Sequence, residues 1–312
     1  MATHQTLKKG WTPDQLGSLT GKTYVITGAS SGTGLEASRV FLSKGAAVVM
    51  MNRNPDKTSK IISELKQEFG DVAKVSFIHL DLSVMASVRQ AAQEVLDNVP
   101  HIDALICNAA IAQLAKRTLT EDGFESQLGV NYFGHFLLCG LLYERINRSK
   151  GRIVMMGSKG YKLGDKTINF DDLNYDTKYG AWNVYAQSKL AQMIFAYELQ
   201  RRTEIAGKDV QIYVCHPGAA RTSLVREDAT LIMKILMPLL ILIGQSAEKG
   251  SWPLVLCAAE EGLGPRKYYG PTKNEMTGPI GECPLEDFIF ERETADRLWT
   301  VSEEKTGFSW TV

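Results

Sequence analysis

The feature that most constrains this chain is an apolar run that passes directly into a glycine-rich turn and then into a helical pattern. Lys22–Thr27 (KTYVIT) has the composition of a strand, and residues 27–34 (TGASSGTG) follow it without a linker. Thr33–Lys44 then carries apolar residues at the 3.6-residue spacing of an amphipathic helix. A strand, a tight turn and a helix in this order are typical of the first unit of a parallel α/β sheet.

The same alternation continues through most of the chain. Five further β-rich runs follow, at Ala46–Met51, Lys74–Leu80, Ile102–Cys107, Arg152–Met156 and Gln211–Cys215. Helical patterns lie between them, at Lys57–Phe69, Ala86–Asn98, Asn131–Asn147 and Val184–Arg202. The runs are almost continuously apolar, as in strands covered on both faces. We therefore expect an α/β fold, a single-domain Rossmann-type doubly wound parallel sheet with helices on both faces.

We expect one domain over residues 1–312, in which residues 1–18 form an N-terminal extension. The alternation weakens after the sixth strand. A helix is expected near Ser246–Glu260, and a tail rich in glycine and proline follows it.

The glycine-rich turn predicts a dinucleotide site. Small residues let backbone approach a pyrophosphate, and the N-terminus of the following helix offers free N–H groups and the positive end of its dipole. A glycine triplet alone is a weak signal, but the strand–turn–helix context makes it specific. The expected contacts in the turn are Gly28, Ser30, Ser31, Gly32, Thr33 and Gly34.

The end of the second strand indicates which dinucleotide binds. Enzymes that use NAD usually place Asp or Glu there, to hold the ribose 2′-hydroxyl. This chain has Asn52 followed by Arg53, which could pair with a 2′-phosphate. The sequence therefore favours NADP(H) over NAD(H), and a solvated Arg53 at the start of a loop is the alternative.

Tyr185 and Lys189 lie four residues apart in a helical pattern, so they share one helix face. A free phenol has a pKa of about 10 and is a poor base at neutral pH. A neighbouring ammonium group is expected to lower the pKa of Tyr185. This spacing also occurs by chance as an exposed pair, but it is specific in a chain that carries the glycine-rich turn upstream.

Together these features resemble the short-chain dehydrogenase/reductase family, strongly over Leu19–Val225 and more loosely beyond. Cys107-Asn108-Ala109-Ala110 is similar to the family's N-A-G motif, with Ala110 in place of the usual glycine. The resemblance implies four catalytic residues, Asn131, Ser158, Tyr185 and Lys189. It also implies further cofactor contacts at Asp81, Leu82, Asn108, Ala109, Ala110, Tyr185, Lys189, Pro217, Gly218 and Thr222.

The resemblance is closest to the branch of retinol-dehydrogenase-like and protochlorophyllide-reductase-like proteins. Phe170–Asn174 (FDDLN) and the tail Leu298–Glu304 are similar to that branch. Light-dependent protochlorophyllide reductases carry a cysteine directly after the Pro-Gly turn, where this chain has Ala219. That difference argues against photochemistry and for ordinary carbonyl reduction.

The implied activity is an NADP(H)-dependent oxidoreductase that interconverts a ketone or aldehyde and an alcohol by hydride transfer, as a carbonyl reductase for apolar substrates. Tyr185 would protonate the substrate oxygen, and Ser158 would stabilise charge on it. Lys189 would lower the pKa of Tyr185 and hold the nicotinamide ribose, and Asn131 would fix a relay water. A non-catalytic NADP-sensing regulator and a protochlorophyllide-reductase-like C=C reductase are the alternatives.

Composition restricts the partners. The formal net charge is zero, which gives no indication of nucleic-acid binding. The five cysteines are scattered and form no C-x-x-C pair, so we expect reduced, mostly buried thiols in a cytoplasmic protein without a metal site.

Leu231–Ile243 is the most apolar stretch, but Lys234 and Pro238 interrupt it and it is shorter than the roughly 20 residues of a membrane-spanning helix. We therefore expect no transmembrane segment. We interpret residues 219–245 as a lid over an apolar substrate pocket. A peripheral membrane contact or a partner subunit is the alternative cover, and the sequence does not decide between a monomer and a homo-oligomer.

Overall fold

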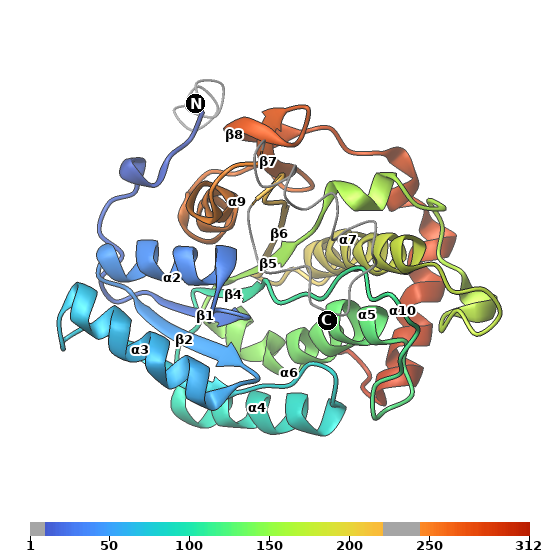
Figure 1. Cartoon of the computed structure of the whole chain (residues 1–312), viewed down its shortest axis with the longest axis horizontal. Coiled ribbons are helices and arrows are strands. Elements are labelled where there is room, and N and C mark those ends of the chain that lie inside the picture. The colour runs from blue at the N-terminus through green and yellow to red at the C-terminus, as the bar shows by residue number, and fades with distance from the viewer. Residues whose placement is uncertain (1–9, 221–243) are drawn as a thin grey trace.

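The computed structural model describes residues 10–220 and 244–312. One eight-stranded sheet lies at its centre, in the order β3-β2-β1-β4-β5-β6-β7-β8 (Figure 1). Neighbouring strands from β3 to β7 are parallel, and β8 pairs with β7 in the antiparallel direction. The strands are β1 (Thr23–Thr27), β2 (Ala47–Asn52), β3 (Val75–His79), β4 (Ala104–Cys107), β5 (Arg152–Met156), β6 (Gln211–Cys215), β7 (Tyr268–Lys273) and β8 (Thr277–Cys283). The predicted α/β class with a doubly wound, Rossmann-type parallel sheet is confirmed.

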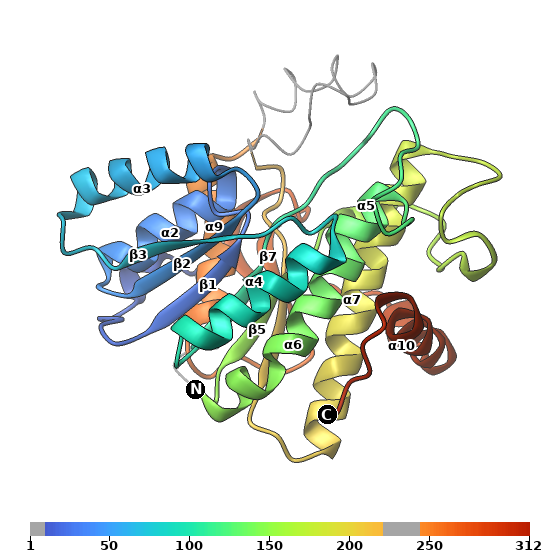
Figure 2. The same ribbon diagram turned by 90° about the horizontal axis from the view of Figure 1, so that it is seen from below.

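Helices cover both faces of this sheet (Figures 1 and 2). One layer contains α2 (Gly32–Ser43), α3 (Pro55–Phe69) and α9 (Ala247–Ala259). The other contains α4 (Met85–Asn98), α6 (Gly134–Arg148) and α7 (Ala181–Ile205), with α10 (Arg292–Thr306) outside α7. Strand order reverses between β1 and β4, and open α/β sheets bind ligands at the carboxyl edge beside such a reversal.

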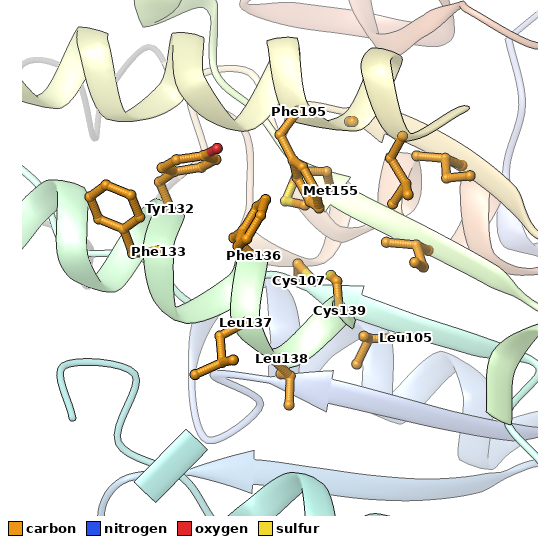
Figure 3. Close-up of a cluster of buried hydrophobic side chains, with 14 of the residues drawn as sticks. Leu105, Cys107, Tyr132, Phe133, Phe136, Leu137, Leu138, Cys139, Met155 and Phe195 are labelled. Carbon is orange, nitrogen blue, oxygen red and sulfur yellow. Dashed lines mark hydrogen bonds between the residues drawn. The ribbon is translucent and has the colours of Figure 1, made fainter. Parts of the chain in front are cut away.

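The layer of α6 and α7 packs on the strands through a large apolar cluster (Figure 3). Leu105 of β4, Phe136 of α6 and Met155 of β5 are completely buried there. Cys107 and Cys139 lie in the same cluster, with their Sγ atoms 3.5 Å apart. All five cysteines are free and buried, as the sequence predicts. Within residues 10–220 and 244–312, no helix has the length and apolar character that crossing a membrane requires.

The sequence pattern assigns no elements to the segment after α9. In the structure this glycine- and proline-rich segment forms β7, β8 and α10. Glycine and proline are depleted in strands, which is why the pattern conceals these two. Here Gly270 is required, because a Cβ on it would lie 2.0 Å from Nε2 of His216. Pro279 lies in the outermost strand, where a missing N–H is tolerated.

The described part of the N-terminal extension packs on this edge of the sheet. The Trp11 side chain is buried, and its backbone N–H donates to Ile280 O of β8 at 3.0 Å. Its indole Nε1 donates to a carboxylate oxygen of Glu260 at 2.8 Å. An exposed edge strand is a site of unwanted pairing, and Trp11 occupies part of it.

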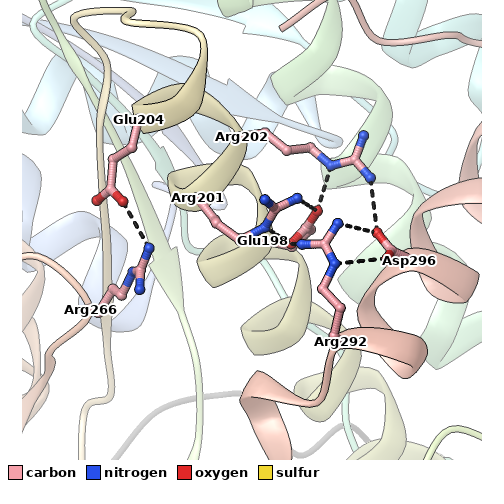
Figure 4. A network of polar contacts seen from close by, with 7 residues as sticks. All are labelled: Glu198, Arg201, Arg202, Glu204, Arg266, Arg292 and Asp296. Carbon is pink, nitrogen blue, oxygen red and sulfur yellow. Dashed lines mark hydrogen bonds and ion pairs between the residues drawn. The ribbon is translucent and has the colours of Figure 1, made fainter.

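An ion-pair network joins α10 to α7 (Figure 4). The Glu198 carboxylate is only 3 % exposed and pairs with the guanidinium groups of Arg201, Arg202 and Arg292. Asp296 of α10 pairs with Arg202 and Arg292. The arginines hold the pKa of Glu198 below its usual value, although burial opposes them. The C-terminal helix is therefore fixed to α7, the helix that carries Tyr185.

Candidate active site

The turn between β1 and α2 brings backbone to the carboxyl edge of the sheet without side chains in the way. Gly28 and Gly32 have φ values of +68° and +58°, in the left-handed region that favours glycine. A Cβ on Gly34 would lie 2.6 Å from both Gly28 O and Asn108 Nδ2. The turn can therefore adopt this compact shape only with glycine, and α2 presents its N-terminus there. Such a cradle fits a pyrophosphate.

Hydrogen bonds join this turn to the loop after β4. The Thr27 hydroxyl oxygen accepts from the backbone N–H groups of Asn108 and Ala109, both at 3.0 Å. The Asn108 amide donates to Thr27 O at 3.0 Å and accepts from the Thr33 hydroxyl at 2.8 Å. Two segments that the sequence predicts as cofactor contacts are thus held as one unit, which also brings Ala110 to the same edge.

The end of β2 has the residues expected for the adenosine side. Asn52 is 4 % exposed, and neither polar atom of its amide has a hydrogen-bond partner among the described residues. A buried, unpaired amide is costly, so a ligand atom there would satisfy it. Arg53 is exposed beside it, and no carboxylate ends this strand. In the neighbouring turn Asp81 accepts from the Ser83 hydroxyl at 2.6 Å, and Leu82 is buried. These residues fit a dinucleotide.

Asn131 lies in a π-helical turn, Gly129–Phe133, immediately before α6. The helical pattern predicted over Asn131–Asn147 is observed, and its first turn is π-helical. π-bulges inside helices occur frequently at functional sites. The Asn131 side chain pairs with the backbone of Ile111 at 2.8 and 2.9 Å and donates to the Ser188 hydroxyl at 2.9 Å. Asn131 therefore joins the loop after β4 to α7.

His135 connects the same segments, and no motif in the sequence marks it. It is completely buried, and its Nδ1 lies 2.9 Å from Asn131 O, which can only accept. Nδ1 therefore carries the proton, and Nε2 accepts from the Thr27 hydroxyl at 2.9 Å. Burial lowers the pKa of His135 to about 4, so the ring is neutral at pH 7.

Ser158, Tyr185 and Lys189 meet where β5 ends beside α7. The Ser158 hydroxyl and the Tyr185 ring lie close together, since a Cβ on Gly160 would be 3.2 Å from each of them. Ser158 also accepts from the backbone N–H of Gly160 at 3.0 Å. Lys189 is 2 % exposed, and its Nζ lies 6.0 Å from the centre of the Tyr185 ring. That ammonium donates to Met156 O at 2.9 Å, at the end of β5.

The pKa of Tyr185 is opposite in direction to the sequence-based expectation. Burial raises the pKa of the phenol, and the hydrogen bond from Ser158 only partly opposes this. Burial also lowers the pKa of Lys189 to about 7, so part of its charge is lost at neutral pH. The ammonium is engaged with Met156 O and with the Gln192 side chain at 2.8 Å, rather than with the phenol oxygen. Desolvation outweighs attraction across this distance.

The turn after β6 completes the edge. Gly218 has a φ of +65°, and a Cβ on it would lie 2.4 Å from Met276 O. The Gln245 side chain donates to Pro217 O at 2.6 Å, and Gln245 N donates to Ala219 O at 2.9 Å. The two ends of the predicted lid are therefore paired. Two predictions, Thr222 and the apolar stretch Leu231–Ile243, lie outside the described residues.

The active-site rim, from Ser158 to the start of α7 at Ala181, is mostly irregular. It contains two short 3-10 turns, η3 (Lys159–Lys162) and η4 (Phe170–Asp172). Lys162 and Glu275, which the sequence analysis did not single out, form an ion pair at 3.0 Å beside this rim. No motif marks Glu275, because it lies in the segment interpreted as a tail. Within the described ranges, no group of three or more His, Cys, Asp and Glu side chains could hold a metal ion.

Comparisons with known proteins agree with this geometry. Residues 22–230 match the family model for short chain dehydrogenases. Human retinol dehydrogenase 14 is 37 % identical over 97 % of this chain and 90 % of its own length. Mouse polyprenol dehydrogenase is 32 % identical over 96 % of this chain and 88 % of its own length.

Solved structures share the fold. An uncharacterised protein from Mycobacterium Paratuberculosis is 32 % identical, with a TM-score of 0.78 over 97 % of this chain and all of that one. An alcohol dehydrogenase from Thermococcus sibiricus has a TM-score of 0.55 at 24 % identity, over 75 % of this chain and 88 % of its own, which shows likeness of fold alone. The chain belongs to the short-chain dehydrogenase family, in its retinol-dehydrogenase-like branch, and is an oxidoreductase of that family.

Proposed function

We propose that this oxidoreductase interconverts an apolar carbonyl compound and its alcohol with NADP(H), and that it acts mainly as a carbonyl reductase. The observation that carries the proposal is the arrangement of Tyr185, beside Ser158 and backed by the buried Lys189, at the sheet edge that also holds the glycine turn. A phenol and a hydroxyl that lie side by side can both reach one substrate oxygen.

The glycine turn and the loop after β4 would hold the dinucleotide, and Asn52 and Arg53 would face its 2′-phosphate. When bound, the nicotinamide supplies the hydride. The absence of a carboxylate at the end of β2, the unpaired Asn52 amide and the exposed Arg53 support NADP(H). Pro217 and Gly218 would line the nicotinamide side.

Tyr185 acts as the general acid in the proposed reduction and transfers its phenolic proton to the substrate oxygen. The phenol is protonated at neutral pH, as a general acid must be, and the proton moves when hydride transfer makes the substrate oxygen a stronger base than the phenolate. Ser158 donates a hydrogen bond to the same oxygen as negative charge develops there. Lys189 replaces the lost proton or stabilises the phenolate, and its pKa of about 7 makes both protonation states accessible.

We propose that Asn131 holds the loop after β4 against α7, beside the predicted relay water. Its amide does not itself transfer a proton, because it is hydrogen-bonded to Ile111 and Ser188. The relay water remains a prediction. We further propose that the chain works as one domain, since the sheet continues without interruption from β3 to β8.

The names of the relatives guide the choice of substrates. Retinol and polyprenol are long apolar alcohols, and the similarity supports a substrate of that class. The test measures NADPH and NADH consumption by the purified protein with retinal, a long-chain prenyl aldehyde, short ketones and quinones. The proposal expects turnover of the long apolar aldehydes with NADPH. Tight NADPH binding without turnover of any carbonyl would instead indicate the regulatory alternative.

A further inference from the structure

The tip of the β7–β8 hairpin, residues 273–276, holds two sides of the candidate site at once. On one side Lys159 Nζ donates to Asn274 O at 2.8 Å, and Lys162 Nζ pairs with the Glu275 carboxylate at 3.0 Å. On the other side Ala219 N donates to Met276 O at 2.8 Å, directly after the Pro-Gly turn. Three consecutive residues of the tip thus contact the Ser158 side and the turn after β6.

The lysines belong to η3, the turn that sets the position of the Ser158 hydroxyl. Ser158 is the N-cap of η3, because its Oγ accepts from Gly160 N. Gly160 also lies against the Tyr185 ring, since a Cβ on it would be 3.2 Å from that ring and from Ser158 Oγ. A shift of η3 would therefore change the distance between the two side chains that share the proposed hydrogen bond to substrate.

A shielded ion pair attaches η3 to the hairpin tip. The Lys162 and Glu275 side chains are each 11 % exposed, so their ion pair is largely shielded from solvent. Lys162 Nζ also donates to Pro284 O at 2.8 Å and lies 3.6 Å from the Glu286 carboxylate, which is 44 % exposed. Removing the Lys162 ammonium would leave the Glu275 carboxylate without its partner in a poorly solvated place.

The backbone of the hairpin tip is strained at Glu275, the residue that pairs with Lys162. Asn274 and Glu275 have φ values of +53° and +55°, and Met276 N donates to Lys273 O at 3.1 Å. This is the pattern of a two-residue turn with both central residues left-handed, for which Asn-Gly is preferred. Glutamate in the place of that glycine is unfavourable locally, and strain of this kind persists where the rest of the structure requires it.

We propose that Glu275 and Lys162 are positioning residues, through which the hairpin tip fixes Ser158 relative to Tyr185 and to the Pro-Gly turn. The proposal rests on the carbonyl chemistry argued above, in which Ser158 binds the substrate oxygen. It assigns a function to the strand pair β7–β8, which otherwise only extends the sheet.

The test compares Lys162→Met, Glu275→Gln and Glu275→Gly with the parent protein, and uses Lys178→Met, at an exposed lysine of the same rim, as the control. A displaced reacting group costs about tenfold or more in rate, so each of the three variants should lower kcat by about tenfold. The dissociation constant for NADPH, measured by fluorescence titration, should stay within about twofold, and Lys178→Met should behave like the parent. Glu275→Gly removes the backbone strain, so full kcat in that variant would show that the carboxylate is not needed and would overturn the proposal.

Two further measurements separate positioning from general stability. Lys162→Arg, which keeps the positive charge and the hydrogen-bond donors toward Glu275 and Pro284 O, should retain most of the parental kcat. In a Ser158→Ala background, adding Lys162→Met should cost less than about twofold, because the residue through which it acts is gone. An unchanged tenfold effect in that background would contradict the proposal. A fully active Tyr185→Phe variant would refute the proposed function itself. If Tyr185→Phe is inactive and Lys162→Met is fully active, only the positioning role of Lys162 and Glu275 is refuted.

Discussion

Two buried neutral histidines predict that this protein loses stability as the pH falls from 8 to 5. Burial lowers the pKa of His135 to about 4 and that of His216 to about 3. In the unfolded chain a histidine has a pKa of about 6.5. Between these values the unfolded state binds more protons than the folded state, so the free energy of unfolding decreases as the pH falls.

The magnitude follows from the two pKa values. With a folded pKa of about 4 and an unfolded pKa of about 6.5, His135 destabilises the protein by about 2 kcal/mol at pH 5 relative to pH 8. His216 adds a similar amount, about 2 kcal/mol. The effect begins as the pH falls below about 6.5 and, for His135, levels off below about 4.

The assay is urea unfolding of the parent and of His135→Phe at several pH values from 8 to 5. The variant loses its hydrogen bonds to Thr27 and Asn131, so it should be less stable at pH 8 by about 2–5 kcal/mol. Its further loss between pH 8 and pH 5 should be smaller than that of the parent by about 2 kcal/mol. If His135→Phe and the parent lose stability in parallel as the pH falls, the neutral, buried state assigned to His135 is wrong.

Three further outcomes are expected. Glu198→Gln should destabilise the protein by about 1–3 kcal/mol in urea unfolding, because three partly exposed arginines lose their shared carboxylate, and Glu144→Gln at an exposed ion pair should change stability far less. Arg53→Ala should weaken NADPH more than NADH in calorimetric titration, and equal weakening would exclude a contact with the 2′-phosphate. Gly34→Ala should cost about 1–3 kcal/mol of stability through overpacking, whereas Gly17→Ala, with nothing within 4 Å of its Cβ, should be tolerated; similar thermal midpoints for the two would contradict the close packing of the turn.

The sequence predicts the first six strands well because each is a short apolar run between helical patterns of a different period. Observed bounds differ from the expected ones by only one or two residues, as for β2 and β3. β3 does depart from a fully buried strand, since it lies at the edge of the sheet and Ile78 is the one buried residue of its five. β7 and β8 could not be predicted from the sequence. Tertiary contacts, such as that between Gly270 and His216, require their glycines, and no local pattern shows these contacts.

The sequence identifies some residues of the candidate site and not others, for the same physical reason. Motif residues such as Tyr185, Lys189 and Asn108 could be found, because local spacing and neighbouring elements identify them. His135 and Glu275 could not, because their partners lie far away in the sequence: Thr27 is 108 residues from His135, and Lys162 is 113 residues from Glu275. The direction of the pKa shift of Tyr185 could not be predicted either, because it depends on how deeply the phenol is buried, which no local pattern specifies.

The role of Tyr185 as the general acid is tested by comparing Tyr185→Phe with the parent protein, using the best aldehyde substrate and NADPH. We expect kcat to fall by a factor of about 10² or more, because a phenyl ring has no proton to donate, while the NADPH dissociation constant remains near the parental value. If the variant binds NADPH normally and reduces the aldehyde at close to the parental rate, the proton comes from another group and Tyr185 is not the acid.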